Sequence, residues 1–217
     1  QAGAMEKAVL HGYWRSTCSW RVRIALNFKK VDFEYKAVHL VKDGGEQHKP
    51  EYKTINPAGY VPALEIDGHT LSESLPICEY LEETRTEGHA LLPKDAADRF
   101  KVRRLCEVVN AGTQPIQNLS VLGRVAEFGG DKKAWAQAAI TKGLATFESL
   151  VASTKGKYCF GDEVTLADVF LVPQIYNANR FEVDVEKEFP LINEIIGNLS
   201  EIEEFVKAHA DNQPDAQ

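Results

Sequence analysis

The turn at residues 14–21 brings together side chains that can hold or form a thiolate. Its four hydroxyl or thiol groups and two guanidinium groups belong to Arg15, Ser16, Thr17, Cys18, Ser19 and Arg21. A helical pattern starts in this turn, and the N–H groups and dipole at a helix start favour an anionic sulfur. We therefore expect thiolate chemistry here. The alternative is that the hydroxyls of Ser16, Thr17 and Ser19 only cap the helix.

A second polar pair, Glu73-Ser74, precedes another helical pattern that carries Pro76 in its first turn. A helix start suits a carboxylate, and the Glu73 side chain could accept a charged amine. The pair would therefore fit the backbone groups of a bound amino acid, although such pairs are also common helix caps. Upstream, Val61-Pro62 is a candidate cis peptide bond beside the same site.

The cysteines and histidines show no spacing typical of a metal or dithiol centre. Cys18, Cys78, Cys106 and Cys159 are far apart and form no Cys-x-x-Cys pair, and the six histidines form no metal-type pairs. We expect no metal and a single cysteine in the turn, which disfavours a glutaredoxin-type reductase. Cys78, Cys106 and Cys159 are predicted to be packed thiols.

The elements that must position these residues alternate in type over the first part of the chain. Strand patterns cover residues 8–13 and 33–37, with a helical pattern between them that ends at Phe28. A predicted hairpin at residues 61–71 turns at Asp67-Gly68 and leads into the helix after Glu73. The order βαβ then ββα predicts an α/β domain with a mixed sheet and a ligand site at the carboxyl end of the first strand.

Beyond about residue 95 only helical patterns remain, which predicts an all-α bundle. We expect domains at 5–90 and 95–217, joined by the linker Leu92–Asp95. Trp135 and its apolar stripe are predicted to be core, Asp168 to be a helix cap rather than a catalyst, and the tail Asn212–Gln217 to be frayed. Met5 is the expected natural start, since Gln1–Ala4 resemble a cloning remnant.

The charge balance restricts the partners. Lys and Arg number 25 against 32 Asp and Glu, a formal net charge of −7, which argues against nucleic acid and against acidic membrane surfaces. No apolar run approaches the ~18 residues of a membrane span, and no signal peptide pattern is present, so a cytoplasmic globular protein is expected. A small anionic ligand would have to be attracted locally, by Arg15, Arg21 and helix starts.

Several motifs spread over the chain resemble the zeta class of glutathione transferases. The matching segments are residues 16–26, 41–45, 56–57, 61–62, 73–74, 80–85, 114–120, 161–168, 177–181 and 213–215. The resemblance covers nearly all of Met5–Gln217. It departs from the family where Thr17 replaces the second serine of Ser-Ser-Cys and where Glu73 replaces glutamine.

The resemblance implies a thioredoxin-like N-terminal domain, an all-helical C-terminal domain, a homodimer and bound glutathione. It also implies a reaction, the cis–trans isomerisation of maleylacetoacetate to fumarylacetoacetate in phenylalanine and tyrosine breakdown. A thiolate would add to the double bond, the resulting single bond would rotate, and elimination would return the thiol.

The same resemblance implies roles for individual residues. Ser16 is expected to stabilise the glutathione thiolate, Cys18 to assist, and Arg180 to meet a substrate carboxylate. The implied glutathione-binding residues are Ser16, Thr17, Cys18, Ser19, Trp20, Arg21, Gln47, Val61, Glu73, Ser74, Gln114, Asn118, Leu119 and Ser120.

Two alternatives remain open. The same thiolate could serve a broader glutathione transferase that displaces halide from α-haloacids such as dichloroacetate. A non-catalytic module of this fold could instead bind ligands or partner proteins, but it would not need to retain Ser16 and Arg180.

Overall fold

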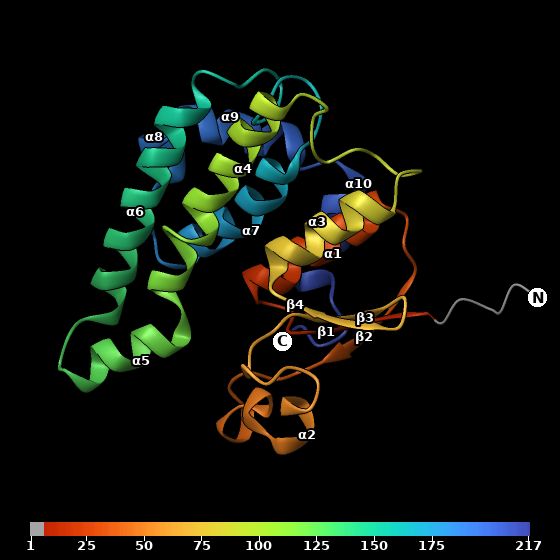
Figure 1. Ribbon diagram of the computed structural model, residues 1–217. Helices are drawn as coiled ribbons and strands as arrows, with labels where there is room; N and C mark the ends of the chain where they lie inside the picture. Colours follow the sequence, from red (N-terminus) through yellow and green to blue (C-terminus); the bar gives the residue numbers. More distant parts are fainter. Residues whose placement is uncertain (1–6) are drawn as a thin grey trace, which may run out of the picture. The chain divides into compact units, whose positions relative to one another are not determined.

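A computed structural model of the chain, shown in Figure 1, describes residues 7–217, so the expected start at Met5 lies outside the described residues. These residues form two compact units. The first unit extends to Ala90 and also includes Ile202–Gln217, and the second is Leu91–Glu201. The boundary between Ala90 and Leu91 lies just before the expected linker Leu92–Asp95. The segment Ile202–Gln217, which we expected in the helical domain, groups with the first unit.

The first unit is built on a four-stranded mixed sheet (Figure 1). Its strands are β1 (Ala8–Gly12), β2 (Phe33–Ala37), β3 (Ala63–Ile66) and β4 (His69–Ser72), in the order β2-β1-β3-β4. β1 is parallel to β2 and antiparallel to β3, and β3 is antiparallel to β4. The predicted βαβ and ββα units are therefore confirmed.

Local turn chemistry explains the hairpin and the loop before it. Asp67 and Gly68 both have positive φ, 55° and 75°, as the two-residue turns that match strand twist require. The peptide bond between Val61 and Pro62 is cis, as predicted.

Four helices and three short 3₁₀ turns complete the first unit. They are α1 (Thr17–Phe28), α2 (Pro50–Lys53), α3 (Ser74–Thr84), α10 (Glu203–Ala208), η1 (Lys42–Gly44), η2 (Glu46–His48) and η4 (Ala210–Asn212). α1 is buried on nearly every side, with Val22, Ile24 and Leu26 fully inaccessible to solvent. It packs against both α3 and α10, so it is the central helix of this unit.

The C-terminal segment is anchored to α1, so the prediction of a frayed tail is wrong. Asn27 Nδ2 donates to the Glu204 carbonyl at 2.9 Å. The ring centroids of Trp20 and His209 lie 4.9 Å apart at 77°, an edge-on contact. Further along, the Gln213 side chain donates to two carbonyls of the preceding turn, which fixes the chain as it leaves η4.

The second unit is helical, as predicted. Its elements are α4 (Ala96–Asn110), η3 (Gln114–Gln117), α5 (Leu119–Glu127), α6 (Lys132–Val151), α7 (Leu166–Arg180), α8 (Val185–Glu188) and α9 (Pro190–Leu199). α7 is buried over most of its length and packs against α4, which also contacts α6. α9 ends at Leu199, and the chain from Ile202 onward belongs to the first unit.

Asp168 is a buried cap, as predicted. Its carboxylate accepts hydrogen bonds from the Thr165 N–H at 2.8 Å, the Thr165 hydroxyl at 3.1 Å and the Cys159 N–H at 2.9 Å. By accepting these bonds, the Asp168 carboxylate pairs N–H groups at and near the start of α7 that would otherwise lack an acceptor. Asp168 thus joins the loop at Cys159 to α7.

Trp135 is not core, contrary to the prediction, although part of its stripe is. Leu144, Phe147 and Val151 of the predicted stripe are buried and Ala139 and Leu150 are half-buried, while Trp135 is 47% exposed. The Trp135 Nε1–H donates to the Ile116 carbonyl at 3.0 Å. The indole therefore holds η3 against α6 instead of filling the interior.

None of the helices within residues 7–217 is long and apolar enough to cross a membrane. No group of three or more histidine, cysteine or acidic side chains in that range could hold a metal ion.

Candidate active site

Sheet topology brings three predicted ligand-binding segments to one edge of the first unit. β1 ends at Gly12 and leads into the turn that carries Ser16. His11 pairs with Ala63, and Ala63 pairs with Ser72. Because β3 is antiparallel to its neighbours, the start of β3 and the ends of β1 and β4 share this edge. Val61 and Glu73, which lie just outside β3 and β4, are placed there with Ser16.

Ser16 is the N-cap of α1. Its half-buried Oγ accepts a hydrogen bond from the Ser19 N–H at 3.2 Å. A hydroxyl that accepts through a lone pair still has its hydrogen to donate. Capping and stabilisation of a thiolate are therefore compatible roles for Ser16.

The remaining residues of the turn separate into one partly accessible thiol and several buried supports. Cys18 is half-buried in the first turn of α1. Ser19, Trp20 and Arg21 are at most 1% exposed. We expected these three residues to bind glutathione; in this structure their side chains lie in the interior of the unit. Thr17 is also buried, at 5% exposure.

The other cysteines are packed thiols, as predicted. Cys78, Cys106 and Cys159 are buried. Burial raises the pKa of the Cys78 thiol to about 12. Burial, with a further contribution from the Asp168 charge, raises the pKa of Cys159 well above its ordinary value. Cys18 is thus the one partly accessible thiol in the described part of the chain.

Gln47, in η2, presents a buried acceptor with no partner among the described residues. Its Nε2 donates to the Leu40 carbonyl at 3.3 Å, while its Oε1 is buried and unpaired. A buried acceptor without a donor costs free energy. A ligand amine or amide N–H placed there would remove that cost.

Glu73 and Ser74 begin α3 in different ways. The exposed Glu73 occupies the N-cap position with φ of 68°, and its side chain makes no capping hydrogen bond. Left-handed backbone at a residue other than glycine is strained and is concentrated at ligand sites. Ser74 is buried, and its Oγ accepts from Arg21 Nη1 at 3.1 Å. Capping by the Glu73 side chain, one of our two interpretations, is therefore wrong.

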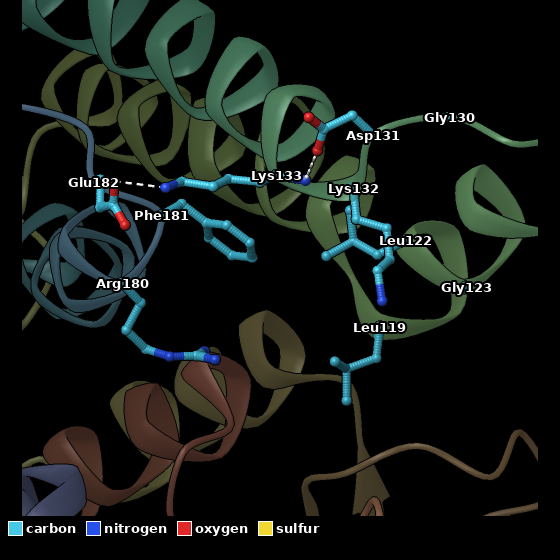
Figure 2. A pocket seen from close by; sticks show the side chains of 10 residues that line it. All are labelled: Leu119, Leu122, Gly123, Gly130, Asp131, Lys132, Lys133, Arg180, Phe181 and Glu182. Atoms are coloured by element: carbon cyan, nitrogen blue, oxygen red, sulfur yellow. Dashed lines mark hydrogen bonds and ion pairs between the residues drawn. The ribbon is translucent and has the colours of Figure 1, made fainter.

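Within the second unit, Leu119 and Arg180 line the same pocket of about 670 Å³ (Figure 2). The pocket lies between the start of α5, the start of α6 and the end of α7. Figure 2 shows Phe181, Arg180 and Lys132 reaching into the hollow. Lys132 and Phe181 were not predicted as site residues from the sequence, although Phe181 directly follows Arg180 in a matched motif.

The charged side chains that line the pocket have different partners. Lys133 is neutralised by Glu182, with Nζ and Oε2 2.5 Å apart. The Asp131 carboxylate accepts from the first N–H groups of α6. Arg180 Nη1 donates to the Asn177 Oδ1 at 2.9 Å. Arg180 and Lys132 bring cationic side chains to the lining of the pocket, which is the chemistry that a carboxylate site requires.

Three further predicted residues lie near this pocket in sequence but do not line it. Gln114 is half-buried in η3, and Ser120 is exposed on α5. Asn118 is the N-cap of α5, and its Oδ1 accepts from the Leu119 N–H at 2.7 Å. In this structure Asn118 positions Leu119.

The residues of the first unit fit glutathione. The Ser16 hydroxyl can donate to a sulfur anion, the Gln47 Oε1 requires a donor, and the Glu73 carboxylate can accept an ammonium group. This donor and acceptor set matches the thiol, amides and α-amino group of the tripeptide.

Comparison with known proteins gives one consistent result. The family models "Glutathione S-transferase, N-terminal domain" and "Glutathione S-transferase, C-terminal domain" match residues 15–84 and 125–210. The chain is 48% identical over 214 residues to "Maleylacetoacetate isomerase" of Dictyostelium discoideum, covering 97% of each chain.

Two solved structures extend the comparison to the fold. A bacterial zeta-class maleylpyruvate isomerase in its holo form has a TM-score of 0.92 at 41% identity, covering 96% of this chain and 100% of that one. Maleylacetoacetate isomerase from Anaeromyxobacter dehalogenans 2CP-1, with dicarboxyethyl glutathione and citrate in its active site, has a TM-score of 0.85 at 40% identity and covers 97% of this chain and 98% of that one. The chain therefore belongs to the zeta-class glutathione transferase family, in the branch of the maleylacetoacetate isomerases.

Proposed function

We propose that this chain is a glutathione-dependent cis–trans isomerase that converts maleylacetoacetate to fumarylacetoacetate in phenylalanine and tyrosine breakdown. The observation that carries the proposal is the Ser16 hydroxyl at the start of α1, already supported by the Ser19 N–H. Near full-length similarity to maleylacetoacetate isomerases supports the choice of reaction. The dicarboxyethyl glutathione bound by a solved relative supports both the cofactor and an acidic substrate.

Glutathione, when bound, supplies a thiol that adds to the conjugated double bond, permits rotation and leaves again unchanged. Ser16 donates its hydroxyl hydrogen to the sulfur and lowers the free energy of the thiolate. The dipole of α1 acts in the same direction, because its positive end lies at Thr17. Both effects are present before the substrate arrives, so little reorganisation is needed during the reaction.

Binding of glutathione uses the other residues at the same sheet edge. Gln47 Oε1 accepts an N–H of the tripeptide, and Glu73 accepts its ammonium group. The Val61 backbone lies outside the β1–β3 register, which begins at Ala63, so it can pair with an extended peptide. Arg21 holds Ser74 from inside the unit instead of touching the ligand.

Arg180 binds a carboxylate of the substrate in the pocket beside Phe181. A guanidinium gives two parallel donors to a carboxylate, which orients the substrate as well as attracting it. Negative charge that develops on the substrate carbonyl oxygen is then stabilised by nearby donors. Cys18 forms no covalent bond, since glutathione provides the nucleophile.

We also infer that the enzyme works in the cytoplasm, as expected from its sequence pattern, and that it is a homodimer, as the resemblance implies. Sedimentation equilibrium tests the assembly, with a mass of twice the chain expected. Fractionation of the source cells tests the location.

A comparison of three substrates tests the proposed function. Turnover of maleylacetoacetate, maleylpyruvate and dichloroacetate is measured with saturating glutathione. The proposal expects the highest kcat/KM for maleylacetoacetate. A higher value for dichloroacetate would favour the haloacid transferase, and glutathione binding without turnover of any of the three would favour the non-catalytic module.

A further inference from the structure

The C-terminal motif Gln213-Pro214-Asp215 has no role in the proposed mechanism, yet the structure places it against the loop that carries Ser16. The Asp215 Oδ2 accepts from the Trp14 N–H at 3.0 Å and from the Tyr35 hydroxyl at 3.4 Å. Trp14 lies two residues before Ser16. Residues about 200 positions apart in the sequence thus meet within the first unit.

Arg23 holds the same loop through its backbone carbonyl groups. Its guanidinium is only 1% exposed and donates to the Trp14 carbonyl at 2.9 Å, the Tyr13 carbonyl at 3.5 Å and the Ala208 carbonyl at 3.1 Å. The Tyr13 carbonyl also accepts from the Ser16 N–H at 2.9 Å. Arg23 therefore acts on the backbone group that directly supports Ser16.

The charge of Asp215 favours the cationic form of Arg23. Burial lowers the pKa of Arg23 to about 10, and the charge of Asp215 acts in the opposite direction and favours the cation. The polar tail thus brings a negative charge to a guanidinium that is otherwise surrounded by carbonyls and by the Tyr35 hydroxyl. We call Tyr13, Trp14, Arg23 and Asp215 the tail clamp.

The tail clamp is costly as a purely stabilising device. The Asp215 Oδ1 is buried and has no hydrogen-bond partner among the described residues. A half-buried carboxylate with one unsatisfied oxygen contributes little net stability. What it does provide is a fixed position for the Trp14 N–H, and through it for the turn that ends at Ser16.

We propose that Asp215 is a positioning residue for the glutathione thiolate, acting through the Trp14 backbone and Arg23 to place the Ser16 hydroxyl. This inference rests on the proposed function. Small displacements of a reacting group lower rates strongly, by about a hundredfold per ångström. The last residues of the chain are thereby part of the first unit's thiolate site.

The test measures the pKa of the enzyme-bound glutathione thiol from its ultraviolet thiolate absorbance as a function of pH. The variants are Asp215→Ala, Asp215→Asn and the control Asp211→Asn, an exposed tail aspartate that does not contact the loop. Asp215→Ala is expected to raise the thiol pKa towards that of free glutathione and to lower kcat about tenfold or more, with KM for the substrate unchanged.

The expected pattern among the variants separates positioning from stability. Asp215→Asn keeps an oxygen that can accept from the Trp14 N–H, so the thiol pKa in this variant should stay close to the wild-type value. Asp211→Asn should match the wild type. A wild-type thiol pKa and kcat in both Asp215 variants, with only a lower melting temperature, would overturn the proposal. Because the thiol pKa is read without substrate, absence of isomerase turnover in the wild type would count against the proposed function alone.

Discussion

The Arg21 Nη1 donates a hydrogen bond of 3.1 Å to the Ser74 Oγ, and neither residue is more than 4% exposed. This bond joins α1 to the start of α3. α1 begins beside Ser16 and α3 begins beside Glu73, so one buried bond fixes two of the ligand-binding turns relative to each other within the first unit.

Arg21→Lys should weaken both the fold and glutathione binding. Lysine keeps the charge but cannot reproduce the planar fork of donors, and the loss of a buried charged hydrogen bond costs about 1.5–3 kcal/mol. Urea unfolding and isothermal titration with glutathione measure the two effects. Arg124→Lys, at an exposed pair on α5, is the control and should change neither; unchanged glutathione affinity in Arg21→Lys would contradict this role.

Ser16 and Cys18 should differ sharply when each is replaced by alanine. Loss of a preorganised donor to a developing anion lowers kcat by about 10²–10³-fold, which we expect for Ser16→Ala. Cys18→Ala should retain activity within about tenfold of the wild type, because it removes no nucleophile. Steady-state kinetics on maleylacetoacetate give both values, and equal losses in the two variants would refute this division of roles.

Arg180→Ala should weaken substrate binding. Loss of a charge-assisted pair to a carboxylate costs about 1.5–3 kcal/mol, so KM should rise roughly ten- to a hundredfold. Glutathione affinity should remain at the wild-type value, since Ser16, Gln47 and Glu73, which we propose hold the thiol, an amide and the amine of glutathione, belong to the first unit. Lys133→Ala serves as the matched control, because the Lys133 cation is already paired with Glu182. A larger increase of KM in Lys133→Ala than in Arg180→Ala would contradict the assignment.

Alkylation should identify Cys18 as the accessible thiol. Cys78 and Cys106 are fully buried, and the raised pKa of Cys78, about 12, keeps it protonated near neutral pH. Iodoacetamide followed by peptide mass spectrometry should modify Cys18 first. The Cys18→Ala variant should lose this fast phase, and early modification of Cys78 or Cys106 would show that the packing of α3 or α4 is looser than described.

The sequence predicted the parts of the fold that depend on local chemistry. The alternation in Phe33–Ala37, the turn at Asp67-Gly68 and the cap at Asp168 each have a local physical cause, and all three are confirmed. Ser16 could be selected for the same reason, because its position before an apolar helix is visible in the chain.

Long-range partners could not be predicted in the same way. Arg21 and Arg23 look like exposed arginines, because charged side chains are rarely buried. Only the fold shows that α1 is covered on nearly all sides, with Ser74 and the Ala208 carbonyl as their respective partners. The prediction of a frayed tail failed for a related reason. A polar segment that ends a chain usually frays, and the contact of Asp215 with Trp14, which holds this tail, spans almost the whole sequence.

The initial rate of maleylacetoacetate conversion shows whether the thiol of glutathione is the nucleophile of the isomerisation. It is measured with glutathione, without glutathione, and with S-methylglutathione, which offers the same peptide contacts but no free thiol. The account predicts rapid conversion only with glutathione, and competitive inhibition when S-methylglutathione is added to that reaction. An equal rate without glutathione, or with S-methylglutathione in its place, would contradict it.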